Sequence, residues 1–255
     1  MRIAAIYDIH SNEVALEAVL HAIQLEQPDL IVVGGDIVPG PLPRTTLALL
    51  QQLGDKARFI RGNGDREVVA AFDGQPFDAS MPTEVRQATQ WVAQQLEPSQ
   101  RDFLAGMPEQ LAFTIDGLGE ILFCHATPRN DVEIFTQLSP DERLHTIFAG
   151  VQQSVVVCGH THMQFERAID GIRIINPGSV GMPYADQPGA YWALLGPDGI
   201  TFKHTVYDLN DAAGRIRVSG FPGAAEFAAE NVLKVPTAAE ALAVFEPSTT
   251  QQSQR

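Results

Sequence analysis

The sequence is short of basic residues relative to acidic ones. Lysine and arginine number 17 against 31 aspartates and glutamates, which gives a formal net charge of −14. Proteins that bind nucleic-acid polymers need Lys and Arg to replace the counterions of the phosphates, and no basic stretch is present here. We therefore expect neither a nucleic acid polymer nor a membrane surface as a partner.

Long apolar runs and a cysteine framework are also missing. No apolar run approaches the roughly 20 residues of a membrane span. The N-terminal segment MRIAAIYDIHSN lacks the apolar region of about 7–15 residues and the cleavage site of a signal peptide. The two cysteines, Cys124 and Cys158, each end an apolar run, so we expect two reduced, buried thiols. These features predict a cytoplasmic protein.

What is present is an alternation of short apolar runs and helical patterns. Apolar runs at residues 3–7, 30–34 and 57–60 predict strands, and helical periodicity over 12–27 and 45–53 separates them. This order implies parallel strands joined by crossover helices.

The second half of the chain is rich in strands. After a helical middle over residues 82–106, strands are predicted at QLAFTID, EILFC, SVVVCG, FERAI, IRIIN, AYWALL and ITFKHTV, and the pattern is helical again from Asp208. Two facing sheets with helices outside them satisfy both halves. No linker divides the chain, so we expect a single domain over residues 1–246 and a disordered polar tail over 247–255.

Five of the apolar runs end in groups that can bind metal ions. In chain order these are Asp8-Ile9-His10, Gly35-Asp36, Gly62-Asn63-Gly64-Asp65, His125 and Gly159-His160-Thr161-His162. Ligands of α/β sheets lie outside the carboxyl ends of the strands, so distant residues can meet at one edge. Residues i and i+2 of an extended segment point the same way, which predicts that Asp8 and His10 reach one ion. Each motif alone is more often a turn, a helix cap or a core histidine, but the five together indicate a metal site.

The series DIH, GGD, GNGD, CHATP and GHTH resembles the calcineurin-like metallophosphoesterase superfamily. The segment NPGSVGMP is similar to one in its small bacterial, phosphodiesterase-like branch. The resemblance implies an α/β fold, a four-layer α-β-β-α sandwich of two facing mixed sheets. It implies two metal ions bridged by Asp36: the first held by Asp8, His10, Asp36 and His162, the second by Asp36, Asn63, His125 and His160.

The resemblance also implies the chemistry. Asp36 and Asn63 would be catalytic, and Asp65 would orient the site from behind the ligands. Mixed carboxylate, imidazole and amide-oxygen ligands suit Mn, Fe, Zn or Ni, of which we favour Mn. Two ions roughly 3.5–4 Å apart can hold a bridging hydroxide that attacks phosphorus in line. We predict a dinuclear metal-dependent hydrolase of phosphate esters or anhydrides, specifically a phosphodiesterase or nucleotide-type phosphohydrolase.

The sequence departs from the family pattern at two positions. Many members have a histidine directly after the motif asparagine, where it helps to protonate the leaving group, but this position is Gly64 here. His145, which follows His125 in a predicted helix, is a candidate for the missing acid. Met182 stands where the branch often has a polar residue, which predicts a changed pocket.

A small phosphorylated substrate also needs contacts with its phosphate. Arginine forks suit phosphate oxygens. The candidates near the motifs are Arg44, Arg61, Arg66 and Arg129. We favour Arg129, which lies nearest a ligand in sequence, together with Asn63.

Two other functions are compatible with parts of the pattern. A non-catalytic metal-binding interaction scaffold on the same fold would be free to lose ligands, whereas all seven ligand positions hold competent residues. A metal-dependent peptidase would need a helical His-Glu-x-x-His pattern, which the sequence lacks. No feature of the sequence points to an oligomeric state.

Overall fold

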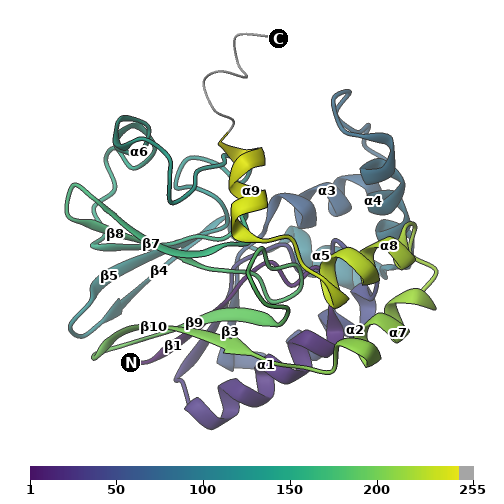
Figure 1. Ribbon diagram of the computed structural model, residues 1–255, viewed down its shortest axis with the longest axis horizontal. Helices are drawn as coiled ribbons and strands as arrows, with labels where there is room; N and C mark the ends of the chain where they lie inside the picture. The colour runs from purple at the N-terminus through teal and green to yellow at the C-terminus, as the bar shows by residue number, and fades with distance from the viewer. Residues whose placement is uncertain (247–255) are drawn as a thin grey trace.

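The computed structural model describes residues 1–246, and its centre is a pair of mixed sheets (Figure 1). The first sheet contains β1 (Ile3–Ile6), β2 (Leu30–Val33), β3 (Ala57–Phe59), β9 (Ala190–Gly196) and β10 (Gly199–Thr205), in the order β10-β9-β1-β2-β3. The second contains β4 (Gln110–Ile115), β5 (Gly119–Cys124), β6 (Val155–Val157), β7 (Gln164–Ile169) and β8 (Ile172–Pro177), in the order β4-β5-β6-β8-β7. The tail predicted at 247–255 lies outside the described residues.

Helices flank both sheets. They are α1 (Glu13–Glu26), α2 (Pro43–Gln51), α3 (Asn63–Phe72), α4 (Thr83–Gln95), α5 (Pro98–Ala105), α6 (Asp141–Ile147), α7 (Leu209–Arg217), α8 (Ala224–Ala228) and α9 (Ala238–Phe245), with the short turns η1 (Gly54–Lys56) and η2 (Ala229–Leu233). Figure 1 shows α6 and α9 beside the second sheet and α1, α2 and α7 beside the first.

The N-terminal units form as predicted from their periodicity. β1 pairs in parallel with β2, and β2 with β3, and α1 and α2 make the crossovers. α1 begins at Asn12, whose side chain accepts a hydrogen bond from the backbone of Ala15 at 3.2 Å, and ends at Gln27, which has left-handed backbone angles. Pro28 follows and prevents the helix from continuing.

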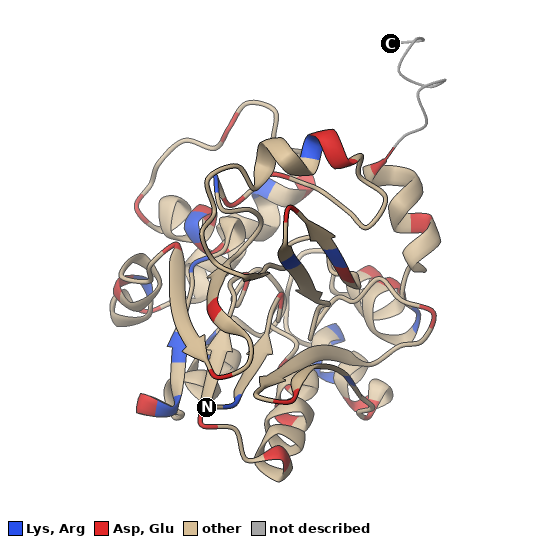
Figure 2. Cartoon of the chain, turned by 90° about the vertical axis from the view of Figure 1, so that its left-hand side faces the viewer, with Lys and Arg blue, Asp and Glu red and all other residues tan. Residues whose placement is uncertain are grey.

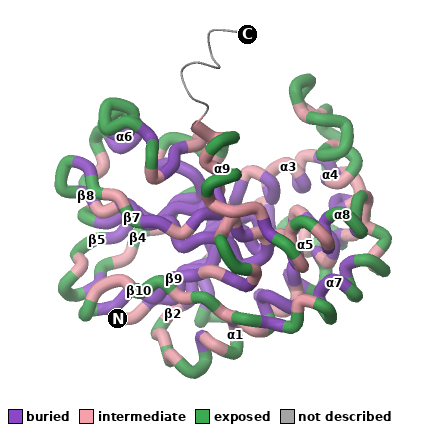
Figure 3. The backbone as a smooth tube through the Cα atoms, in the orientation of Figure 1, coloured by how far each residue is buried: buried purple, intermediate pink, exposed green. Residues whose placement is uncertain are grey.

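Three apolar cores separate four layers. Alternate residues of β1 face opposite sides: Ile3 and Ala5 belong to the core between the sheets, whereas Ala4 and Ile6 belong to the core beneath the helices. A third core joins the second sheet to α6 and α9. Figure 3 shows the buried backbone concentrated along the strands. The predicted fold class, a four-layer α-β-β-α sandwich, is confirmed.

Several smaller expectations can be compared with the structure. Cys124 and Cys158 are both buried and free, and burial raises the pKa of Cys124 to about 12. No helix within residues 1–246 has the length and apolarity to cross a membrane. Lys and Arg are distributed over several elements and interspersed with acidic residues in the view of Figure 2. One element was missed: the GNGD motif does not lie in a loop, because Asn63 opens α3.

Candidate metal centre

The structure places all five motifs at one edge shared by the two sheets. Asp8 and His10 follow β1, Asp36 follows β2, and Asn63 follows β3 as the first residue of α3. His125 follows β5 directly, and His160 and His162 follow β6. Because β1, β2 and β3 are parallel, as are β5 and β6, these are carboxyl ends of neighbouring strands.

The side chains form two adjacent groups that could each hold a metal ion. Asp8, His10 and His162 make one and Asp36, His125 and His160 the other, and within each group the ligand atoms lie within 4.8 Å of one another. Oδ2 of Asp36 is 3.8 Å from Nε2 of His10 and 3.6 Å from Nε2 of His125. Asp36 therefore lies between the two groups, which is where the family resemblance implies a bridge.

Each histidine of the two groups is oriented by a backbone carbonyl. Nδ1 of His10 faces the carbonyl of Pro39 at 3.0 Å, Nδ1 of His125 that of Gly34 at 2.9 Å, Nδ1 of His162 that of Met182 at 2.8 Å, and the ring of His160 that of Val132. A nitrogen against a carbonyl must carry the proton, so the other ring nitrogen turns a lone pair inward. This is the usual arrangement of metal-binding histidines.

The inward-facing atoms of the two groups are all hydrogen-bond acceptors, so they cannot bond one another. Nε2 of His10 and Nε2 of His162 are 3.1 Å apart, so two lone pairs face each other. Burial lowers the pKa of His162 well below its usual value and lowers that of His160 to about 4, so both rings are neutral at neutral pH and each carries a single proton. Oδ1 of Asp8 is buried without a hydrogen-bond partner. A bound cation would satisfy all of these atoms, so the residues present fit divalent metal ions.

The carboxylates make the second group attractive to positive charge. Burial lowers the pKa of His125, but the charges of Asp36 and Asp8 outweigh this effect, and the net shift is upward. Burial also raises the pKa of the Asp8 carboxyl to about 8, with His125 opposing the shift. The upward shift of the His125 pKa shows that the carboxylates favour positive charge among these groups.

The side chain of Asn63 faces the same set of atoms. Its Oδ1 lies 3.2 Å from Nε2 of His125, 3.1 Å from Nδ1 of His160 and 3.2 Å from the carbonyl oxygen of Asp131. With the amide nitrogen inward, Asn63 would donate to these acceptors; with the oxygen inward, it joins them as a ligand. The second orientation completes the second group in the way the sequence predicts.

The backbone is strained at the same positions. Among the described residues, eight non-glycine residues have positive φ, and five of them are predicted ligands: Asp8, His10, Asp36, His160 and His162. Each left-handed non-glycine residue costs about 1–3 kcal/mol and persists only when its surroundings enforce it. The expectation that Asp8 and His10 converge because their segment is extended was wrong. Left-handed turns direct them instead, fixed by hydrogen bonds from Asp8 N to the Gly35 carbonyl and from His10 N to the Asp36 carbonyl.

Asp65 lies behind the ligands. It is fully buried, and its carboxylate accepts hydrogen bonds from the backbone of Ile37 at 2.9 Å, Val38 at 3.1 Å and Gly62 at 3.2 Å. These bonds join the loop after Asp36 to the start of α3. The position suits an orienting residue, which is the role that the sequence suggests.

Gly64 is packed too tightly for a side chain. A Cβ there would lie 2.4 Å from Cγ of Pro39 and 3.0 Å from Oδ1 of Asp36. A histidine side chain at this position would therefore have to displace Pro39. His145 does not replace it: Nδ1 of His145 bonds Asp170 at 2.6 Å, at the turn joining β7 to β8, which is the end of that hairpin remote from the motifs.

All four arginines considered for the phosphate are paired with carboxylates. The pairs are Arg44 with Glu97, Arg61 with Glu109, Arg66 with Asp131 and Arg129 with Glu133. Arg129 also faces the carbonyl of Thr146 and lines a cavity of about 150 Å³ that reaches His125. A phosphate can engage Arg129 only if this arginine shares or changes its partner.

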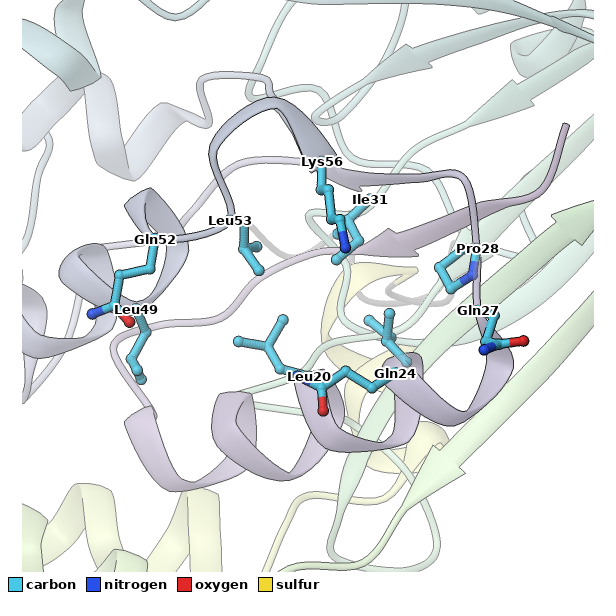
Figure 4. Close-up of a pocket in the computed structure, with 10 residues that line it drawn as sticks. Leu20, Gln24, Gln27, Pro28, Ile31, Leu49, Gln52, Leu53 and Lys56 are labelled. Carbon is cyan, nitrogen blue, oxygen red and sulfur yellow. The ribbon is translucent and has the colours of Figure 1, made fainter.

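A larger hollow contains none of the predicted site residues. It is a groove of about 720 Å³ between α1 and the end of α2, where Leu20, Leu49 and Leu53 face one another below Lys56 (Figure 4). Its α1 residues belong to the half of the helix remote from Asn12 and the ligand loops. The convergence of ligands, and not the size of a hollow, locates the site.

Sequence reasoning missed the role of the end of β8 and of the segment that follows it. Nδ2 of Asn176 donates to the carbonyl of Gly159 at 2.9 Å and to Oγ1 of Thr161 at 3.0 Å, which fixes the loop carrying His160 and His162. Oγ of Ser179 donates to the carbonyl of Asp8 at 2.6 Å. The NPGS letters indicated the family, but a pattern of letters could not show that the segment ties both ligand loops together.

Met182 and Tyr184 lie on the outer side of His162. Met182 orients the ring through its backbone carbonyl, so this bond does not depend on the type of side chain. The ring of Tyr184 stacks on that of His162, with centroids 5.2 Å apart and an interplanar angle of 28°. We therefore expect Tyr184, as well as Met182, to shape the pocket beside His162.

The sequence profile of the calcineurin-like phosphoesterase superfamily domain matches residues 1–196. The chain belongs to this superfamily. A metallophosphoesterase from Sphaerobacter thermophilus has a similar structure, with a TM-score of 0.71, 29% identity and coverage of 91% of this chain and 99% of that one. A hypothetical protein from Pyrococcus horikoshii OT3 has a TM-score of 0.77 at 21% identity, covering 89% and 97%.

One curated relative extends the match along the sequence. An uncharacterized protein of Methanocaldococcus jannaschii is 29% identical over 240 residues, covering 86% of this chain and 93% of that protein. Membership of the calcineurin-like phosphoesterase superfamily confirms the predicted family, makes the chain a phosphoric ester hydrolase and implies divalent metal ions as its cofactors.

Proposed function

We propose that this calcineurin-like phosphoesterase is a dinuclear enzyme that hydrolyses small phosphodiesters or phosphoanhydrides, including nucleotide-type substrates. The observation that carries the proposal is the inward orientation of four histidines around Asp36. Asp8, His10, Asp36 and His162 would hold the first ion, and Asp36, Asn63, His125 and His160 the second. We favour Mn²⁺ because the set mixes carboxylate, imidazole and amide-oxygen ligands.

The residues of the site would have distinct roles. Bound divalent ions would supply a water nucleophile at neutral pH and offset the charge of the phosphate. Asp36 would keep the two ions adjacent, and the carbonyl-bound histidines would keep their lone pairs aimed inward. Asn63 would contact both an ion and the substrate, while Asp65 would hold the Asp36 loop against α3 through the three backbone hydrogen bonds described above.

The leaving group would depart without help from a histidine. Of the seven histidines, four belong to the metal groups, His145 is bound to Asp170, and His21 and His204 lie in α1 and β10, outside the ligand loops. A positioned acid typically contributes about 10²–10⁴-fold to rate. Leaving groups that are already stable anions, such as phosphate or a nitrophenolate, would lose little. We therefore propose that anhydrides and aryl esters are preferred over alkyl esters.

Size and charge would limit the substrate. The net charge of −14 and the pairing of all four candidate arginines support a small phosphorylated compound over a polymer. We propose Arg129 as a substrate contact that exchanges Glu133 for phosphate.

We also propose that residues 1–246 act as one domain, since β10 continues the sheet of the matched region. The protein would be cytoplasmic, where its two free thiols remain reduced.

A substrate panel tests this function. With Mn²⁺, we expect rapid hydrolysis of bis(p-nitrophenyl) phosphate and a nucleoside diphosphate, rates on a matched alkyl diester lower by about 10²–10⁴-fold, and no cutting of linear duplex DNA. A chelator should abolish the activity, and re-addition of Mn²⁺ should restore it.

Each alternative has its own outcome in this panel. Metal binding without turnover of any compound would favour the non-catalytic scaffold. Equal rates on aryl and alkyl diesters, with chemistry rate-limiting, would show that the site contains a general acid. Cleavage of the DNA would overturn the proposed limit on substrate size.

A further inference from the structure

We propose that Arg66 is a positioning residue for the second metal group, because it locks residues 127–133 onto α3. This inference rests on the proposed function, since it presumes an ion held by Asn63, His125 and His160. Nothing in the family resemblance assigns a role to Arg66, whose candidacy as a phosphate contact rested only on its place beside the GNGD motif.

The contact itself is a two-pronged ion pair. Nε of Arg66 donates to Oδ2 of Asp131 at 2.7 Å, and Nη2 donates to Oδ1 at 3.1 Å. Such fork-to-fork pairs fix the relative orientation of both groups, which a lysine cannot do. Arg66 lies in the first turn of α3, three residues after Asn63. The pair therefore ties the loop to the same turn that presents the ligand.

The loop delivers backbone carbonyls to two ligands. The carbonyl oxygen of Asp131 lies 3.2 Å from Oδ1 of Asn63, so it packs against this ligand without a hydrogen bond, and the carbonyl of Val132 faces the ring of His160. A carbonyl that binds the outer nitrogen of a ligating histidine fixes the ring and raises its basicity. If Asp131 moved, both contacts would move with it.

The loop is internally ordered, so it should shift as a unit. Oγ1 of Thr127 accepts from the backbone of Arg129 at 3.2 Å and Asn130 at 3.3 Å. Oδ1 of Asn130 accepts from the backbone of Val132 at 3.0 Å and Glu133 at 2.7 Å. The segment also begins two residues after His125. A shift of the segment would therefore affect Asn63, His125 and His160, the three ligands that belong to the second group alone.

Apolar packing does not duplicate this anchor, although Nε2 of Gln110 also holds the start of the loop by donating to the carbonyl of Pro128 at 2.8 Å. The cavity of about 150 Å³ beside the pair is lined by polar side chains, including Arg66, Asp131 and Gln110, so apolar contacts cannot take over if the pair is removed. The Arg66 side chain is 42% exposed, and its removal leaves the apolar cores intact. Substitution should therefore affect the metal group more than the fold.

The chain offers a matched control at the other end of α3. Arg101 of α5 makes a similar two-pronged pair with Asp73, which caps the C-terminal end of α3. Arg101→Ala removes the same kind of interaction from the same helix without touching the loop. Arg66→Lys keeps the charge but loses the fork, and Asp131→Asn keeps one acceptor oxygen.

The test measures Mn²⁺ binding to the purified chain of residues 1–255. Calorimetry gives the number and affinity of the ions, and electron paramagnetic resonance shows whether the ions are isolated or paired. We expect two ions on the wild type and on Arg101→Ala. Arg66→Ala should bind the weaker ion about 10–100-fold less tightly while keeping the other, and its spectrum should show isolated Mn²⁺ at concentrations that fill both wild-type sites. Arg66→Lys and Asp131→Asn should fall between, and kcat should recover at high Mn²⁺.

The outcomes separate the two proposals. If the wild type binds two ions and Arg66→Ala binds both as tightly as Arg101→Ala does, the positioning role is overturned and the dinuclear function stands. An equal loss of both ions, or a fall in Tm beyond that of Arg101→Ala, would make Arg66 a general structural residue and also overturn the inference. Fewer than two ions on the wild type would overturn the proposed function, and this inference with it.

Discussion

Asp36→Ala is expected to lower kcat/KM by far more than the roughly 10–100-fold typical of residues that only support a ligand. The reason is its position: Oδ2 lies within 4 Å of ligand nitrogens in both groups, and Oδ1 accepts from Gly64 N at 2.8 Å. Removing the carboxylate would take one ligand from each ion and free both ions to separate. Activity against an aryl phosphodiester at saturating Mn²⁺ measures the effect.

Two further variants show whether the loss reflects metal chemistry. Asp36→Asn keeps an oxygen for Gly64 but removes the charge, and should lose nearly as much activity with an unchanged Tm. Asp29→Asn changes an exposed carboxylate at the opposite end of β2 and should leave activity unaltered. Turnover by Asp36→Ala close to that of the wild type would contradict the bridging role.

Gly64→Ala is expected to impair both activity and stability although it adds a single methyl group. The new Cβ would meet the ring of Pro39 at 2.4 Å and Asp36 at 3.0 Å. Because the Pro39 carbonyl orients His10 at 3.0 Å, any shift of Pro39 would turn a ligand of the first metal group. Overpacking of this kind costs about 1–3 kcal/mol of unfolding free energy.

The comparison for this variant is Gly214→Ala in α7. No atom lies within 4 Å of a Cβ built at Gly214, so alanine there should raise the unfolding free energy by about 0.5–1 kcal/mol through its better helix propensity. The unfolding free energy, measured with denaturant, and the affinity of the first metal group for Mn²⁺ should both fall for Gly64→Ala. Neither should fall for Gly214→Ala. Wild-type values for both quantities in Gly64→Ala would refute the coupling from position 64 to His10.

The packing at Gly64 changes the meaning of the missing histidine. From the sequence, a histidine placed at 64 should supply the acid that the family uses there. In the structure, its Cβ would clash with Pro39 before its ring could reach a substrate. A histidine at position 64 would have to displace Pro39, so we expect replacing Gly64 alone to restore little of the acid's contribution.

The sequence predicted that the five motifs meet at one edge because each motif follows an apolar strand. Strand order and right-handed crossovers then bring Asp8, Asp36 and His125 to one edge whatever the details of the loops. The detailed direction of each side chain was not predictable. Left-handed angles at Asp8 and His10 depend on hydrogen bonds to the loop after β2, which lies more than twenty residues away along the chain.

Two features were missed for physical reasons. The start of α3 was missed because Asn63 and Gly64 are typical turn residues, and the helix is stabilised there by Asp65 and by packing rather than by propensity. The contacts of Asp131 were missed because an ion pair with Arg66 and the position of a backbone carbonyl leave no sequence motif.

Counting bound metal in the purified wild-type chain tests the central claim most directly. Elemental analysis after saturation with Mn²⁺ and removal of free ion should give two ions per chain, and His160→Ala and His162→Ala should each retain one. One ion or none in active, metal-replete wild type, or two ions retained in both histidine variants, would contradict a dinuclear site built from these seven residues.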